Sequence, residues 1–381
     1  MKKVIITFIV YFLLLISCKD KVSSSGEIII GEATEINATT LFSDVKIIKL
    51  ESSNDAIIGA WPIVKFVEDR IYITDDIREV IYIYDVEGRF LNKLMRRGQS
   101  GEEYLKIADF FVDTEASCIE VYDGEKNRIL FYDLSDFSCL KVTNIPLNQV
   151  SSFHKQNGNY YFYTATFTNF INDAGTNSEL IYYNTSTGDV FPLFDVYLNS
   201  NAVHYFGLKS KDIFKENNKE DLFASLSWHG DKIYNLNDKK MTSISINFGR
   251  NAIPLEKHSL PYDDRLSYVQ TLSNNSNVKF LPLLYAYDDD YIIVGSQSNF
   301  PPTLNYYFKF LKSGKEYHSS KLINDFPGFD NSEIYIDSEQ GGNIVSIIDP
   351  SNLEENSPVL DHLKVTTSDN PVILIFKLKE Q

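Results

Sequence analysis

Two stretches of this sequence repeat each other at a spacing of about 48 residues, and this repetition constrains the fold more than any other feature. "IYITDD" at 71–76 aligns with "IEVYDG" at 119–124, and "IYIYDVEGRF" at 81–90 aligns with "ILFYDLSDF" at 129–137. Weaker copies follow at 160–190, from Lys232 onward, and at 291–317. Each copy holds short runs rich in Ile, Val, Tyr and Phe between Asp, Asn and Gly turn residues. Four strands in about 50 residues is the pattern of one β-propeller blade.

The two ends of the repetitive region each supply one strand that has no neighbour in sequence. "VKIIKLE" at 45–51 lacks a preceding partner, and "PVILIFKLK" at 371–379 lacks a following one. Pairing them completes a last blade and removes the open edges. We therefore expect an all-β fold, a six-bladed β-propeller of four-stranded antiparallel blades whose last blade is closed by the N- and C-terminal strands. A pair of β-sandwiches is the alternative, but it does not require regular four-strand repeats. Helical periodicity is confined to 254–272 and 350–364.

The N-terminus has the composition of an export signal. Two basic residues, Lys2 and Lys3, follow Met1, and residues 4–16 form an apolar run interrupted only by Thr7. "LISC" ending at Cys18 resembles the bacterial lipobox. The run is short for a transmembrane helix. An ordinary secretory signal or a signal anchor with a chance cysteine is the alternative. We predict a lipoprotein signal peptide over 1–17, a flexible tether over 18–30 that begins with lipidated Cys18, and the propeller over 31–381.

The charge of the chain restricts its partners. It has 52 acidic and 36 basic side chains and a formal charge of −16, which becomes −18 once Lys2 and Lys3 are removed with the signal peptide. An acidic surface repels phosphate backbones, and no basic run offsets that repulsion, so no nucleic-acid partner is expected. Solubility alone also explains a charge of this size.

The two cysteines that follow Cys18 are expected to be free thiols. Cys118 is placed on the second strand of its blade and Cys139 on the fourth, with a strand between them. Next-nearest strands lie nearly 10 Å apart, whereas a disulfide needs Cα atoms within about 7 Å.

Several segments resemble the six-bladed β-propeller lipoproteins of Bacteroidetes, relatives of the NHL-type propellers. They are "IKLE", "RIYITD", "IYIYDVEGRFLNKL", "RRGQSGEEY", "DKIYNLND" and "NPVILIFKLK". The family's blade junction usually reads Gly-Gln-Gly-Pro-Gly-Glu-Tyr, and this chain keeps Gly98, Gln99, Glu103 and Tyr104 but has Ser100, Gly101 and Glu102 between them. With Cys18, the resemblance implies an outer-membrane lipoprotein, periplasmic or surface-exposed, that meets the membrane only through its lipid.

The junction "RRGQSGEEY" at 96–104 is the main candidate binding site. In a propeller it carries the chain from the outer strand of blade 1 across one face to the inner strand of blade 2, and we expect φ > 0 at Gly98 and Gly101. The alternative is purely structural: Arg97 and Glu103 pair with each other, or with backbone carbonyls, to brace the two blades. The candidate ligand-binding residues are Arg96, Arg97, Gln99, Glu103 and Tyr104 in the loop, Arg78 and Arg128 in neighbouring turns, and Trp228 and His229 in blade 4.

Catalytic and metal-binding motifs are not recognisable in the sequence. The six histidines show no HxH or HxxxH pairing, and no GxSxG elbow or P-loop occurs. Asp76 and Asp123 are better explained as turn caps than as metal ligands. No catalytic residue, metal ligand or cofactor is therefore predicted, although the resemblance to NHL-type propellers leaves calcium open.

Three functions are compatible with these observations. We expect a non-catalytic binding or scaffold protein of the cell envelope, a monomer that holds a small polar ligand, a glycan or an envelope protein. The alternative is a hydrolase or lyase of the NHL-like type assisted by a divalent cation. A structural partner of an outer-membrane complex is the third. Carboxylate or amide oxygens converging in the channel would favour the enzyme, whereas an apolar or plugged channel would favour the scaffold.

Overall fold

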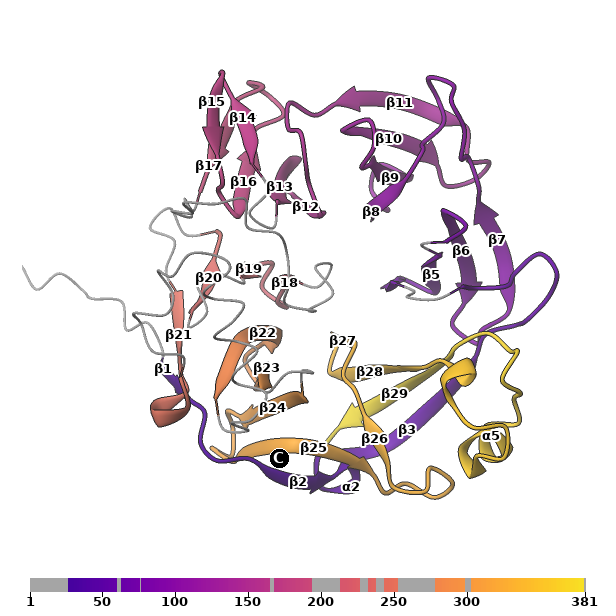
Figure 1. The fold of residues 1–381 in the computed structure, drawn as a ribbon, viewed down its shortest axis with the longest axis vertical. Coiled ribbons are helices and arrows are strands. Elements are labelled where there is room, and N and C mark those ends of the chain that lie inside the picture. The colour runs from indigo at the N-terminus through magenta and orange to yellow at the C-terminus, as the bar shows by residue number, and fades with distance from the viewer. Residues whose placement is uncertain are drawn as a thin grey trace, which may run out of the picture.

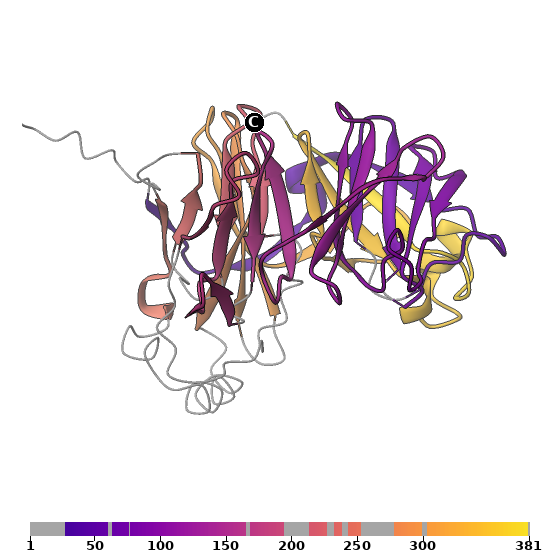
Figure 2. The same ribbon diagram turned by 90° about the horizontal axis from the view of Figure 1, so that it is seen from above.

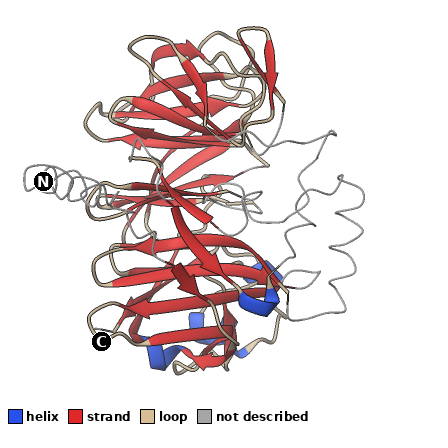
Figure 3. Ribbon diagram, turned by 90° about the vertical axis from the view of Figure 1, so that its left-hand side faces the viewer, coloured by secondary structure: helices blue, strands red, loops and turns tan. Residues whose placement is uncertain are grey.

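The computed structural model describes residues 27–59, 63–75, 77–164, 168–193, 213–226, 232–237, 243–252, 278–298 and 303–379. Strands make up most of this fold, and the helices are short (Figure 3). The strands form six antiparallel blades arranged in a ring (Figure 1). The predicted six-bladed β-propeller is confirmed.

Each blade is one four-stranded antiparallel sheet. Blade 1 contains β4 (Val64–Val67), β5 (Arg70–Asp75), β6 (Val80–Asp85) and β7 (Phe90–Leu94). Blade 2 contains β8 (Ile107–Asp113), β9 (Cys118–Asp123), β10 (Arg128–Asp133) and β11 (Cys139–Asn144). Blade 3 contains β12 (Ser152–Gln156), β13 (Asn159–Tyr163), β16 (Leu180–Tyr183) and β17 (Val190–Pro192), with the hairpin β14 (Asn169–Ile171) and β15 (Ala174–Thr176).

The second half of the ring follows the same order. Blade 4 contains β18 (Phe214–Glu216), β19 (Leu222–Ser225), β20 (Lys232–Asn235) and β21 (Ser243–Asn247), followed by the 3-10 helix η1 (Gly249–Asn251). Blade 5 contains β22 (Lys279–Tyr287), β23 (Tyr291–Ser298), β24 (Thr303–Phe310) and β25 (Glu316–Asn324), with the short β26 (Ser332–Ile334) beside β25. Blade 6 contains β27 (Ser338–Gln340), β28 (Asn343–Ile348), β29 (Val372–Leu378) and β3 (Phe42–Lys49).

The core lies between adjacent blades, which explains why the middle strands are continuously apolar rather than alternating. In β6, Ile81 and Ile83 pack in the cluster between blades 1 and 2, whereas Tyr82 and Tyr84 on the other side pack against blade 6. Because side chains alternate along a strand, a sheet covered on both faces needs apolar residues at every position. Full burial of each large apolar side chain contributes about 1.5–3 kcal/mol.

The ring closes in blade 6, as the sequence predicts. β29 and β3 are antiparallel partners over a register that runs from Val372 opposite Lys49 to Leu378 opposite Phe42. β3, which precedes all of blade 1 in the sequence, is thus the outer strand of blade 6. The two strands that close the ring, β3 and β29, are held in one sheet.

An N-terminal segment, residues 27–41, adds a feature that the sequence does not predict, and we name it the N-terminal strap. β1 (Glu27–Ile29) pairs in parallel with β21, β2 (Thr34–Asn37) pairs in parallel with β25, and the strap ends in α2 (Ala38–Leu41). The strap runs along the outside of blades 4 and 5 before it enters blade 6 (Figure 1). β1 lies within the range 18–30 assigned to the tether.

The two faces of the ring carry different connections. Among the described residues, the crossovers between blades and the connections between second and third strands lie on one face, which we name the crossover face; the other described turns lie on the opposite face. The 3-10 helix η3 (Pro350–Asn352) and α5 (Pro358–Leu363) are in the connection between β28 and β29, on the crossover face. Figure 2 shows α5 on this face and the C-terminus near the other. α5 falls inside the helical pattern at 350–364, whereas 254–272 lies outside the described residues.

The two cysteines are free, as expected. Cys118 is buried at the start of β9 and Cys139 is half-buried at the start of β11. β10 pairs with both strands and separates them.

Candidate functional site

The loop between β7 and β8 folds back on itself over blades 1 and 2. Arg97 and Tyr104 form a short parallel bridge. The Gly98 N–H donates to the Tyr104 carbonyl (3.0 Å), and the Tyr104 N–H donates to the Arg96 carbonyl (3.1 Å). The loop is therefore a closed turn with its own backbone hydrogen bonds.

Tyr104 anchors this loop to the interior of the propeller. Its side chain is fully buried, and its hydroxyl accepts the Arg96 N–H (3.1 Å) and donates to the Glu79 carbonyl (2.8 Å). Its ring meets the Tyr132 ring edge to face, with centroids 6.2 Å apart. Burial raises the pKa of Tyr104, so the hydroxyl stays protonated and able to donate.

Arg128 clamps the same loop from blade 2. Its guanidinium donates to the carbonyls of Gly101 (2.9 Å) and Glu103, and its Nε lies 3.3 Å from the Asp123 carboxylate. Arg128 is 8% exposed and Asp123 is fully buried. The Asp123 carboxylate also accepts the Glu125 N–H (3.2 Å), which is the turn-capping role expected from the sequence.

Gly98 is explained by close approach and not by an unusual backbone angle, whereas a Cβ on Gly101 would meet no atom within 4 Å. Gly98 and Gly101 do not have positive φ, so that expectation is wrong. A Cβ on Gly98 would lie 2.0 Å from Oε2 of Glu103, which accepts the Ser100 N–H (2.9 Å). The Ser100 N–H holds the pKa of Glu103 below its usual value. Glycine at 98 therefore makes room for the carboxylate that orders the turn.

The remaining candidates in this region lie at the surface. Arg96, Arg97 and Gln99 are exposed, and over the described ranges no ion pair joins Arg97 to Glu103. Arg78 is partly engaged, because its guanidinium donates to the Ile57 carbonyl (2.7 Å). The bracing comes from Tyr104 and Arg128 instead, while the two arginines at 96 and 97 project from the braced turn.

Three other predicted residues cannot be placed against this loop. Cys18, Trp228 and His229 lie outside the described residues.

The inner strands of blades 2, 3 and 4 bring three rings together. The His154 ring lies between Phe111 (centroids 5.9 Å apart) and Phe214 (5.7 Å). Burial, and then the nearby charge of Lys65, lowers the pKa of His154 to about 3, so the imidazole is neutral at pH 7. Its Nε2 lies 3.9 Å from the Glu216 carboxylate. Aromatic packing, with one neutral histidine, occupies this part of the inner wall.

Carboxylates on the inner strands are used in contacts between blades. Asp109 on β8 pairs with Lys65 of blade 1 (2.8 Å) and accepts the Phe153 N–H of blade 3 (3.0 Å). It thereby links three consecutive blades. Because Asp109 is buried and paired at both oxygens, it has little capacity left for another ligand.

A second buried network joins blades 2 and 3. The Lys155 ammonium lies 2.6 Å from Asp113 and 2.5 Å from Glu120, and the Tyr160 hydroxyl donates to Glu120 (2.6 Å). Sequence reasoning did not identify these residues, although an acidic residue inside the apolar run "CIEVYD" is a signal of a paired buried charge. Across the part of the chain that is described, no group of three or more His, Cys, Asp and Glu side chains is arranged to hold a metal ion.

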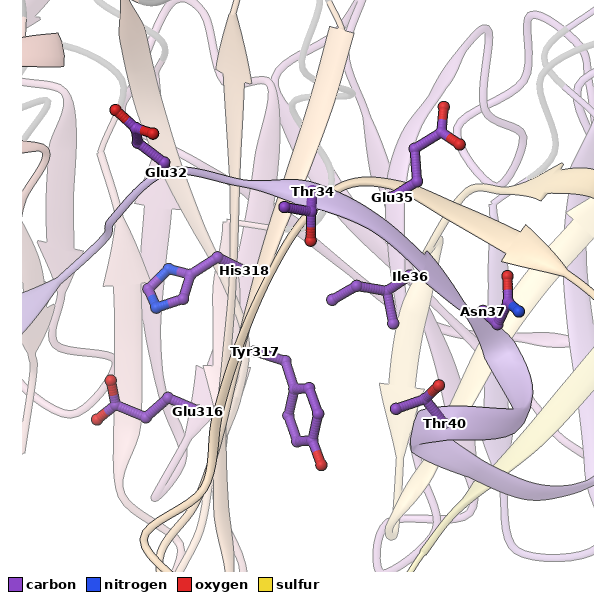
Figure 4. Close-up of a pocket in the computed structure, with 9 residues that line it drawn as sticks. All are labelled: Glu32, Thr34, Glu35, Ile36, Asn37, Thr40, Glu316, Tyr317 and His318. Atoms are coloured by element: carbon purple, nitrogen blue, oxygen red, sulfur yellow. The ribbon is translucent and has the colours of Figure 1, made fainter.

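A shallow groove of about 480 Å³ lies where the N-terminal strap crosses β25 (Figure 4). Its acidic side chains are Glu32 and Glu35 from the strap and Glu316 from β25. His318 at its edge accepts the Gly31 N–H at Nδ1 (3.1 Å), so this side chain holds the strap in place.

The closed ring and the braced loop on its crossover face define this chain as a six-bladed β-propeller. It belongs to the family described as "Domain of unknown function (DUF4934)", whose model matches residues 25–377. No curated protein matches the sequence. Among described residues, no helix is both long enough and apolar enough to cross a membrane.

Two solved structures share the fold. One, from Bacteroides fragilis, is described as a "putative exported protein"; it is 17% identical, with 92% of this chain and 99% of that chain covered and a TM-score of 0.73. The other is a member of the DUF4221 family from Bacteroides vulgatus, 10% identical, with 89% and 97% covered and a TM-score of 0.51. At these identities the similarity shows the fold alone.

Proposed function

We propose that this protein is a non-catalytic binding protein of the cell envelope that takes an anionic ligand on the crossover face of blades 1 and 2. The ligand is a carboxylated or sulfated glycan, or an acidic segment of an envelope protein. The 96–104 loop supplies the contact surface.

The observation that carries this proposal is an exposed arginine pair on a rigid turn. Tyr104 and Arg128 fix the loop from below, and Arg96 and Arg97 remain at its surface. In a chain of formal charge −16, the two adjacent exposed arginines and Lys126, whose ammonium donates to the Gln99 carbonyl (3.4 Å), outnumber Glu102 and Glu103 in this loop. Guanidinium groups bind carboxylate and sulfate-like oxygens through paired hydrogen bonds, and a pre-ordered loop loses little entropy on binding.

Side chains on the inner strands and on the neighbouring strand β9 support a binding role over a catalytic one. Asp109, Asp113 and Glu120 are each paired with a lysine, and aromatic rings surround His154. These carboxylates form contacts between blades that hold the ring together, so few of their oxygens are left to bind a cation.

The N-terminal sequence supports an envelope location. The apolar run ending at Cys18 fits a lipoprotein signal, and the Bacteroides fragilis protein with the same fold is described as exported. We propose that Cys18 carries a lipid that attaches the propeller to the outer membrane. Loss of palmitate-analogue labelling in Cys18→Ala tests this, and persistent labelling would refute it.

Binding of polygalacturonate, heparin and polyglutamate, with neutral dextran as a reference, tests the ligand class. We expect at least one of these anions to bind and Arg96→Glu/Arg97→Glu to weaken it by about tenfold or more, since charged hydrogen bonds contribute about 1.5–3 kcal/mol each. Arg70→Glu, at the other end of blade 1, is the matched control. No binding of any anion, or an equal loss in the control, would contradict the proposal.

A further inference from the structure

A second cavity lies on the opposite face of the ring, between blades 5 and 6. It has a volume of about 510 Å³. Blade 5 contributes Tyr291 and Phe310, and blade 6 contributes the glycine turn 341–342 and the end of β29 at 377–379. Volumes of about 300–1,000 Å³ are usual for small-molecule sites.

The charge around this cavity is positive. Lys312, Lys377 and Lys379 line it together with one acidic residue, Asp290. Asp290 pairs with Lys312 (2.8 Å), and the Lys379 ammonium donates to the Thr39 carbonyl, which neutralises no charge. The lining residues therefore carry two positive charges in excess, and the Glu339 carboxylate behind Tyr291 and Gly342 offsets one of them, although the chain as a whole carries −16.

The aromatic wall of the cavity is held in place. The Tyr291 hydroxyl donates to Oε1 of Glu339 (3.0 Å), and the same oxygen accepts the Gly342 N–H (2.6 Å). Gly341 and Gly342 both have positive φ (55° and 86°), so the turn requires glycine and places no side chain over the cavity. A fixed ring beside an open glycine turn is suited to the face of a planar or ring-shaped ligand.

We propose that this cavity binds a small organic anion of sugar-acid size, with its carboxylate near Lys377 and Lys312 and its ring against Tyr291. The site is independent of the 96–104 loop, because it lies on the other face of the ring and between different blades. Since the end of β29 forms one wall, a bound ligand also bridges blade 5 to the strand that closes the ring. Binding should therefore stabilise the closed propeller.

Isothermal titration with galacturonate, and with galactose as its neutral counterpart, tests this site on the full mature chain. We expect galacturonate to bind and to raise the melting temperature, and galactose to do neither. Lys377→Met and Lys312→Met should each weaken galacturonate binding by about tenfold, the loss for one charged contact.

Lys315→Met is the control, because Lys315 is exposed in the same turn as Lys312 but does not line the cavity. An affinity for galacturonate that is unchanged in Lys377→Met and Lys312→Met would overturn the proposal, as would equal binding of galactose or an equal loss in Lys315→Met. The Arg96→Glu/Arg97→Glu variant should bind galacturonate here as the wild type does, so failure of this site and failure of the loop site are distinguishable.

Discussion

Replacing Arg128 by methionine should destabilise the propeller far more than replacing Arg97 by alanine. Arg128 is 8% exposed and its partner Asp123 is fully buried, so the substitution leaves a buried carboxylate without its cation. It also leaves the carbonyls of Gly101 and Glu103 without the guanidinium. Breaking a buried pair on one side costs about 3–5 kcal/mol. Arg97 is exposed, and surface substitutions of this kind usually change stability by less than about 0.5 kcal/mol.

Urea unfolding monitored by circular dichroism measures both values. Asp123→Asn in the wild type and in Arg128→Met completes a double-mutant cycle, and we expect strong coupling between the two positions. A cost below about 1 kcal/mol for Arg128→Met would refute the clamp, and a cost of several kcal/mol for Arg97→Ala would show that Arg97 braces the loop. Methionine keeps much of the apolar stem, so a loss reflects the guanidinium and not only packing.

Two further predictions concern the ring and its inner wall. Deleting 370–381 removes β29, which pairs with both β28 and β3, so cooperative unfolding should be lost or shifted strongly to lower urea; an unchanged unfolding curve would contradict the closure in blade 6. His154 has a folded pKa of about 3, lowered mainly by burial, so it stays neutral while the unfolded chain gains a proton near its ordinary value of 6.5. The free energy of unfolding should therefore fall as the pH falls from 6.5 toward 3, by up to about 2 kcal/mol between pH 7 and pH 5. Urea unfolding at these two pH values measures the change, and the part of it that comes from His154 should be absent in His154→Phe.

The blades could be predicted from the sequence because each is a local pattern. Runs such as "VIYIYD" at 80–85 are apolar at every position, and they recur at a fixed spacing between turn residues. The unpaired strands at the two ends then require each other, which fixes closure in blade 6. The repeated pattern and the rules of strand pairing are therefore sufficient to predict the blades and the closure of the ring.

The N-terminal strap could not be predicted in the same way. Its strands are three and four residues long, and each pairs in parallel with a strand more than 200 residues away. Such pairing depends on the outer edges of blades 4 and 5, which exist only in the folded ring. The prediction of a positive φ at Gly98 was wrong for a related reason. Glycine is needed at this position because of where the Glu103 side chain lies, and not because of the backbone angle.

The strap also determines how an anchored propeller would be oriented. β1 is parallel to β21, and β21 runs toward the crossover face, so Glu27 is at the end of β1 that is nearer the opposite face. If Cys18 carries the lipid, only eight residues separate it from Glu27, and they span at most about 29 Å when fully extended. The opposite face would then be held close to the membrane, and the crossover face with Arg96 and Arg97 would point away from it. A ligand-binding loop on the face remote from the anchor is accessible to soluble glycans and proteins, which is the arrangement that the proposed function requires.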